Sequence, residues 1–113
     1  MKYWYVYIMT NKPNGVLYIG VTDNIDERAK EHKLKVYPKS FTAKYNCDKL
    51  IYFEECDNGD KATLREKQLK KWKRDWKIEL IEDMNNNWSD LSLNWNLNFN
   101  KLSLVHDKNN LTS

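Results

Sequence analysis

The chain has 113 residues and a formal net charge of +3, values that fit one domain with a single core. It contains no apolar run long enough to span a membrane, and its N-terminus opens into a strand pattern rather than a signal peptide. We therefore expect a cytoplasmic protein, and since nothing suggests secretion we expect Cys47 and Cys56 to be reduced thiols rather than a disulfide. The two cysteines also lack the spacing of metal ligands.

The first predicted element is a β-hairpin. Residues Tyr3–Thr10 and Val16–Val21 are rich in strand formers and flank the turn-forming sequence NKPNG. Because side chains alternate along a strand, Tyr7 and Tyr18 share one face. A four-residue loop pairs them directly, whereas a two-residue loop makes them diagonal neighbours. Cross-strand aromatic packing alone would explain such a pair. The opposite, apolar face contains Val6, Ile8, Leu17 and Ile19.

A helix over residues 25–35 is predicted next. Asn24, followed three residues later by Glu27, is typical of a helix N-terminus. Arg28 and His32 are four residues apart and so lie on one helix face, which by itself fits two ordinary surface residues. Pro38 ends this segment. A short helical turn at 40–44 and a third strand at 49–54 follow.

A long helix is predicted from about residue 60, with a break near 74–75 and a continuation to 84. Its apolar stripe contains Ala62, Leu69, Trp76 and Leu80. Glu66 falls inside this stripe, where an ionised carboxylate needs a partner or a metal ion. The alternative is a position at the edge of the stripe, paired with Arg65 or Lys70.

Positive charge is concentrated between residues 61 and 77. Such a concentration favours a polyanionic partner, although a solvated lysine-rich helix face has the same composition. The residues on the face that adjoins the apolar stripe are Lys67, Lys70, Lys71 and Arg74.

The composition changes at Asn85, which divides the chain into a domain at 1–84 and an Asn-rich C-terminal extension at 85–113. Apolar and polar residues alternate strictly from Leu91 to Asn100. This period of two predicts an extra strand or an extended arm packed on the domain, and a partly disordered low-complexity tail is the alternative.

Two tripeptides of the hairpin resemble the signature of the GIY-YIG nuclease superfamily. Tyr18-Ile19-Gly20 matches the second signature tripeptide throughout. Tyr5-Val6-Tyr7 matches the first at its tyrosine and has Tyr-Val where the family has Gly-Ile.

Three further positions follow in the order of the family. It carries an arginine, and often a histidine four residues later, on the helix after the hairpin, and Arg28 and His32 match both. Glu66 matches the glutamate that the family carries on a later helix. The resemblance covers residues 3 to about 84 and is greatest to the small stand-alone bacterial branch.

The resemblance implies an α+β fold with a three-stranded antiparallel sheet flanked by helices, and a metal-dependent endonuclease that hydrolyses DNA phosphodiester bonds. Tyr7 would be the general base, with Tyr18 orienting Tyr7 or the water. His32 would assist Tyr7 or contact the phosphate. Arg28 would neutralise charge on the phosphate, and Glu66 would hold one divalent metal, Mg²⁺ or alternatively Mn²⁺.

A tyrosine has a reference pKa of about 10, so a phenolate base needs nearby positive charge. The metal, Arg28 and Lys12 are the candidate sources. Gly20 would let the DNA backbone approach closely, and the lysine-rich face of residues 67–74 would hold flanking phosphates without reading sequence. We therefore expect weak sequence specificity and a preference for DNA structure.

Two other functions fit the sequence. One is a nucleic-acid-binding module of the same fold with little or no catalysis. The other is a protein-interaction domain that uses the alternating tail. The sequence indicates no membrane and no obligate protein partner.

Overall fold

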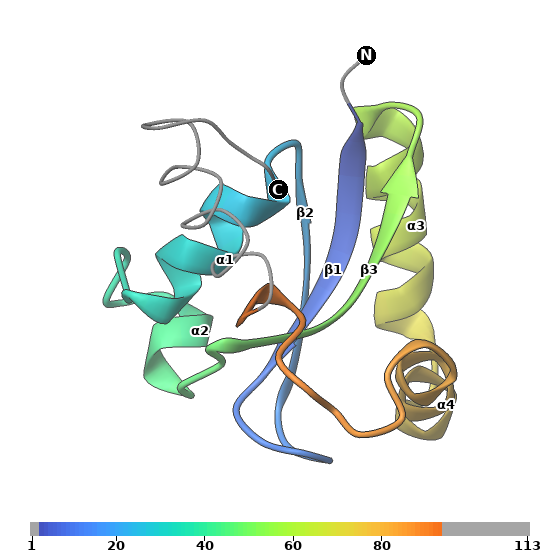
Figure 1. Ribbon diagram of the computed structural model, residues 1–113. Helices are drawn as coiled ribbons and strands as arrows, with labels where there is room; N and C mark the ends of the chain where they lie inside the picture. The colour runs from blue at the N-terminus through green and yellow to red at the C-terminus, as the bar shows by residue number, and fades with distance from the viewer. Residues whose placement is uncertain (1–2, 94–113) are drawn as a thin grey trace, which may run out of the picture.

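The computed structural model describes residues 3–93, which form a three-stranded sheet and four helices (Figure 1). The sheet order is β2–β1–β3, and both pairings are antiparallel. The predicted α+β architecture is therefore confirmed. In chain order the elements are β1 (Trp4–Thr10), β2 (Leu17–Thr22), α1 (Ile25–Lys33), α2 (Phe41–Lys44), β3 (Lys49–Cys56), α3 (Gly59–Lys71) and α4 (Arg74–Met84).

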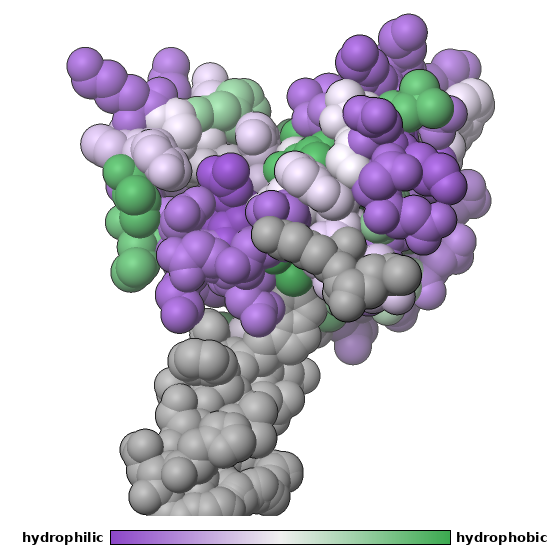
Figure 2. Space-filling model, turned by 90° about the horizontal axis from the view of Figure 1, so that it is seen from above, coloured by the Kyte–Doolittle hydropathy of each residue, from purple (hydrophilic) through white to green (hydrophobic). Residues whose placement is uncertain are grey.

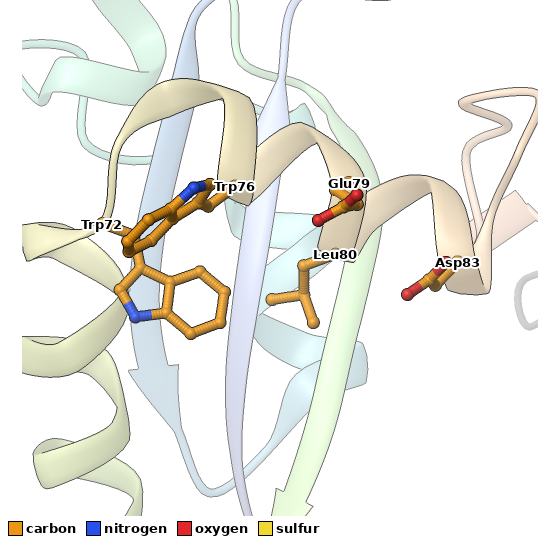
Figure 3. Close-up of a pocket in the computed structure, with 5 residues that line it drawn as sticks. All are labelled: Trp72, Trp76, Glu79, Leu80 and Asp83. Carbon is orange, nitrogen blue, oxygen red and sulfur yellow. The ribbon is translucent and has the colours of Figure 1, made fainter.

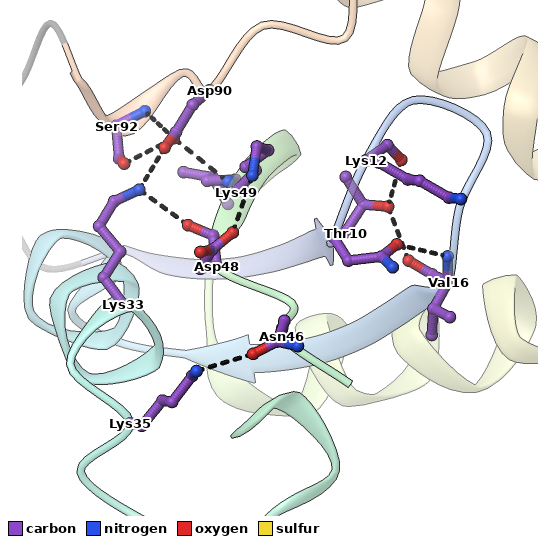
Figure 4. Close-up of polar contacts among 12 residues, drawn as sticks. Thr10, Lys12, Val16, Lys33, Lys35, Asn46, Asp48, Lys49, Asp90 and Ser92 are labelled. Carbon is purple, nitrogen blue, oxygen red and sulfur yellow. Dashed lines mark hydrogen bonds and ion pairs between the residues drawn. The ribbon is translucent and has the colours of Figure 1, made fainter. Parts of the chain in front are cut away.

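The hairpin has the register that the shorter of the two predicted loops requires. Tyr7 pairs with Gly20 and Met9 pairs with Tyr18, so the two tyrosines are diagonal neighbours and the alternative direct pairing is wrong. The ladder ends at Thr10 and Leu17, which leaves a longer connection than two residues. Thr10 Oγ1 stabilises this connection by hydrogen bonding to the carbonyl oxygens of Lys12 and Val16 (Figure 4).

Helices cover both faces of the sheet, with α1 and α2 on one side and α3 and α4 on the other (Figure 1). The apolar hairpin face is part of the core as predicted and packs under α3, in a cluster that includes Val6, Ile8, Ile19, Ala62 and Leu69. The tyrosine face forms a second cluster, which contains Tyr7, Met9, Ile25, Cys47 and Leu50. Tyr7 is thus part of a packed layer between β1 and α1.

The helix boundaries follow local capping and differ from the predictions by a few residues. Asn24 caps α1 by accepting a hydrogen bond from the Glu27 amide, and α1 ends at Lys33. The break between α3 and α4 lies at residues 72–73. Because α4 starts in a new direction there, Trp76 leaves the predicted stripe, while Leu80 still packs against the same core cluster. Trp76 is 51% exposed, whereas Ala62 and Leu69 are fully buried.

The part of the C-terminal extension that the structure describes lies against the sheet. Asn85 is buried and donates to the Ile51 carbonyl oxygen at 3.1 Å. Asp90 forms an ion pair with Lys33 of α1 (Figure 4). Residues 91–93, where the alternation begins, take turn and helical conformation, and residues 94–113 lie outside the described residues.

Two further predictions concern the thiols and the membrane. Cys47 and Cys56 are both free, as expected for reduced cysteines. Among the helices of residues 3–93, none combines the length and the apolar character needed to cross a membrane.

Candidate active site

The candidate site is built on the contact between Tyr7 and Gly20. Tyr7 stands on the central strand β1 and is only 2% exposed. Its partner on the edge strand β2 is Gly20, where an added Cβ would lie 2.5 Å from Tyr7 Oη and 2.6 Å from its Cζ. The missing side chain therefore gives the phenol room to lie over β2, toward the open edge of the sheet.

A chain of hydrogen bonds leads from the Tyr7 hydroxyl to α2. Tyr7 Oη lies 3.0 Å from His32 Nε2, and His32 Nδ1 lies 2.9 Å from Thr42 Oγ1. The Thr42 hydroxyl is buried and lies 3.2 Å from Ser40 Oγ, the hydroxyl that caps α2. With its proton on Nδ1, His32 would donate to Thr42 and leave Nε2 free to accept from Tyr7.

Tyr18 completes a cluster of three rings. Its ring centroid lies 6.2 Å from that of Tyr7 and 5.6 Å from that of His32. The Tyr7 and His32 centroids are also 5.6 Å apart. The diagonal hairpin register therefore brings both signature tyrosines to the same histidine.

The environment keeps Tyr7 and His32 neutral. Burial is the largest cause that raises the pKa of Tyr7 well above its usual value of 10, and the neighbouring Tyr18 and the carboxylate of Glu66 raise it further. The positive charge of Arg28 lowers the pKa of Tyr7. Burial, helped by the charge of Arg28, lowers the pKa of His32 to about 4. A neutral imidazole thus faces a neutral phenol.

Arg28 and Glu66 approach this group from different helices. Arg28 of α1 forms an ion pair with Glu31 at 3.3 Å, and its side chain remains 36% exposed. Glu66 of α3 pairs with Lys70 at 3.0 Å, as the alternative interpretation predicted, and is 20% exposed. The surface is hollowed between the side that carries α1 and α2 and the side that carries α3 (Figure 2).

The other predicted partner of Glu66 has a different role. Arg65 bonds to both oxygens of Glu54 on β3, with its Nε at 3.0 and 3.1 Å and its Nη2 at 2.9 Å. Arg65 therefore joins α3 to the sheet rather than neutralising Glu66.

The side chains near Tyr7 offer one carboxylate to a metal ion, which fits a hard divalent cation that takes its other ligands from the substrate and from water. Within residues 3–93, no group of three or more His, Cys, Asp or Glu side chains could hold a metal ion. A metal here would rest on Glu66, a partly accessible carboxylate whose charge acts on Tyr7. Mg²⁺ accepts such a site because it keeps several waters and uses phosphate oxygens as ligands.

The predicted DNA-binding residues fall into two groups. Lys67, Lys70 and Lys71 are exposed on α3, although Lys70 is engaged with Glu66. Arg74 reaches the hairpin connection instead, where its Nη2 donates to the carbonyl oxygens of Asn14 at 2.7 Å and Gly15 at 2.6 Å. The exposed Lys12 stands in the same connection.

A pocket of about 280 Å³ opens beside the ring cluster, between α1 and α2. Its walls include three predicted site residues, Tyr18, Arg28 and His32, together with Lys35, Tyr37 and Phe41, which the sequence analysis did not single out. Arg28, Lys35 and several rings therefore border one hollow, which is also lined by Glu31, the carboxylate that pairs with Arg28.

A second hollow lies along α4 and has different chemistry. It is lined by Trp72, Trp76 and Leu80 and by the carboxylates of Glu79 and Asp83 (Figure 3). It shares no lining residue with the first pocket. Its lining contains two acidic side chains and no cation, which does not suit a phosphate.

Thr42, Ser40 and Phe41 belong to the site but are not among the residues predicted from the sequence. The signal that was present concerned structure only: Ser40 opens the predicted helical turn at 40–44, and in the structure it is the cap of α2. The spacing of residues along the chain does not predict that α2 folds back on α1 and places Thr42 against His32.

Comparison with known proteins agrees with this geometry. A family model described as the GIY-YIG catalytic domain matches residues 3–79. A UPF0213 protein from Syntrophus aciditrophicus (strain SB) is 36% identical over 78 residues, which cover 69% of this chain and 88% of the relative. Another, from Clostridium perfringens (strain 13 / Type A), is 39% identical over 77 residues, which cover 68% of this chain and 81% of the relative. No solved structure matches the chain.

Proposed function

The chain belongs to the GIY-YIG family, a nuclease-type superfamily, and we propose that it is an endonuclease that hydrolyses DNA phosphodiester bonds at the site around Tyr7. The observation that carries the proposal is the 3.0 Å contact between Tyr7 Oη and His32 Nε2. A buried phenol that meets a neutral imidazole, within the fields of Arg28 and Glu66, is equipped to move a proton at a phosphate.

In this proposal Tyr7 is the general base and His32 receives the proton that Tyr7 releases. Tyr7 Oη takes a proton from the attacking water while its own proton passes to His32 Nε2. Because both transfers occur together, Tyr7 need not exist as a free phenolate, which its raised pKa would disfavour. Tyr18, packed against both rings, holds Tyr7 and His32 in position.

Arg28 and Glu66 supply the charges. The half-exposed guanidinium of Arg28 binds and neutralises a phosphate oxygen. Glu66 is the protein ligand for one divalent cation, Mg²⁺ or Mn²⁺, which when bound supplies positive charge to the phosphate and the leaving oxygen. Lys70 would have to release Glu66 to free this carboxylate, and the exposed position of Lys70 permits that.

The DNA contacts of the proposal are independent of sequence. Lys67, Lys70 and Lys71 bind flanking phosphates from α3, and Lys12 and Arg74 do so from the hairpin connection. Gly20, which was expected to let the DNA backbone approach, is buried, and the Tyr7 phenol fills the space beside it, so its part in the proposal is to hold Tyr7 in place. Contacts to phosphates position a duplex and carry no base information.

A nicking assay on a panel of duplex, nicked, branched, flapped and single-stranded DNA tests the proposal. With Mg²⁺ the protein should cleave at least one substrate, and with EDTA it should cleave none. Glu66→Gln, Arg28→Ala and Tyr7→Phe should each lower the rate by about 10²-fold or more, as the loss of catalytic groups does.

The matched control is Glu79→Gln, which removes an exposed carboxylate from α4. It should cleave like the unmodified protein. Cleavage retained by Glu66→Gln would contradict the proposed role of Glu66. DNA binding without cleavage on every substrate would instead favour the non-catalytic module.

A further inference from the structure

A row of aromatic rings continues from the candidate site to the surface. The Tyr18 ring centroid lies 6.0 Å from that of Phe41, and Phe41 lies 4.7 Å from Tyr45. Phe41 and Tyr45 are 46% and 42% exposed. The row therefore begins at the buried ring of Tyr7 and ends in solvent on α2.

A third exposed ring and several cations surround the end of this row. Tyr37 is 56% exposed and lines the pocket beside the site. Lys35 lines the same pocket, and Lys44 Nζ lies 5.6 Å from the centroid of the Tyr45 ring. Residues 28–45 contain six Lys and Arg residues and one acidic residue, Glu31. The α1–α2 surface, which we define as Lys35, Tyr37, Phe41, Lys44 and Tyr45, thus combines rings with positive charge.

We infer that the α1–α2 surface binds an unpaired stretch of a DNA strand next to the phosphate that is cleaved. Exposed rings between lysines are the chemistry that holds single strands, because the rings stack on unpaired bases and the lysines contact the phosphates. The bases of an intact duplex are already stacked and cannot use these rings. The substrate class is accordingly DNA with a single-stranded segment beside the cleavage point.

The position of the surface argues for this occupant. The ring row is continuous with the candidate site, and Arg28 borders the same pocket as Tyr37. A strand whose phosphate rests on Arg28 would therefore bring its next bases to Tyr37 and Phe41. The inference rests on the proposed function for the identity of this phosphate.

Metal-free binding measurements test the inference separately from catalysis. A single-stranded oligonucleotide and a blunt duplex, each labelled with fluorescein, are titrated in EDTA and followed by fluorescence anisotropy. Tyr45→Ala and Tyr37→Ala should each weaken single-strand binding about 10-fold, the loss expected for one stacked base, and change duplex binding less than twofold. Tyr45→Trp should restore single-strand affinity because an indole also stacks.

The matched control is Tyr3→Ala, since Tyr3 is 38% exposed ahead of β1 and outside the surface. It should bind both probes like the unmodified protein. A second readout is a 2-aminopurine base in the single strand, whose fluorescence should fall on binding to the unmodified protein and fall less on binding to Tyr45→Ala. Thermal melting confirms that each variant is folded.

Equal weakening of both probes, or unchanged single-strand binding in Tyr45→Ala and Tyr37→Ala, would overturn the inference. Unchanged binding of both probes would show that these rings do not contact DNA. If the nicking assay fails while Tyr45→Ala still loses single-strand affinity, the proposed function is wrong and the inference stands. If the protein cleaves DNA but single-strand binding is unchanged in both variants, the proposed function stands and the inference is wrong.

Discussion

The strongest prediction from the structure concerns Gly20→Ala. The added methyl carbon would lie 2.5 Å from Tyr7 Oη, 2.6 Å from Tyr7 Cζ and 3.0 Å from Tyr18 Cε2. Optimal contacts between such atoms are about 3.5–4.0 Å, so the phenol has to move by about 1 Å. Tyr7 is 2% exposed, so we expect this overpacking to destabilise the fold by about 1–3 kcal/mol.

The displacement should harm turnover more than binding. A shift of about 1 Å in a catalytic group can lower the rate by about 10²-fold, so kcat should fall by that order while the Kd for DNA in EDTA stays within twofold. If Gly20 serves mainly to admit the DNA backbone, the Kd should rise instead. Gly59→Ala is the matched control, because its Cβ would lie 3.3 Å from the nearest atom, in Trp4.

A double-mutant cycle tests the steric reasoning itself. In a Tyr7→Ala background the clashing ring is gone, so Gly20→Ala should lose most of its destabilising effect, which gives a coupling energy of about 1–2 kcal/mol. Urea unfolding followed by circular dichroism measures the four stabilities. The same loss of stability in both backgrounds would refute the close approach of Tyr7 to Gly20.

Two further predictions follow from the hydrogen-bond chain. Thr42→Val keeps the shape of the side chain and removes the hydroxyl that holds His32 Nδ1, so kcat should fall about 10-fold and the pH–rate profile should change. Thr42→Ser should restore both the rate and the profile. An unchanged pH–rate profile in Thr42→Val would contradict the role of Thr42. Because His32 has a pKa of about 4 in the folded protein and about 6.5 when unfolded, the unfolded state binds more protons between these values. Stability should therefore be fully present above pH 6.5 and fall by about 1–2 kcal/mol as the pH drops toward 4, an estimate reduced for the partial exposure of the imidazole. His32→Gln should flatten this pH dependence in urea unfolding, and an equally steep dependence in the variant would exclude His32 as its source.

The fold was predictable because its strongest signals are local. Residue parity places Tyr7 and Tyr18 on one face in either hairpin register, so this assignment survives an error in loop length. The helix N-terminus at Asn24 is read from its capping residue alone. The position of the α3–α4 break was harder to predict, because residues 72–73 contain no proline or glycine to mark it.

The candidate site was predictable only in part. Arg28, His32 and Glu66 were selected because they occur in the order of a known family, and Glu66 also because of its place in an apolar stripe. The contact between His32 and Thr42 depends on α2 folding back on α1, and the contact between Gly20 and Tyr7 depends on the register. Neither follows from the spacing of residues along one element.

The structure also changes the reason why a tyrosine can act here. Positive charge was expected to favour the phenolate, yet burial dominates and keeps Tyr7 protonated in the free protein. Burial lowers the pKa of His32 and the charge of Arg28 lowers it further, which makes His32 a poor proton acceptor in the free protein. A phosphate bound to Arg28 brings the offsetting negative charge and so raises the pKa of His32. In the proposed mechanism, the binding of substrate therefore prepares the acceptor for the Tyr7 proton, and the site stays inactive toward water when no phosphate is bound.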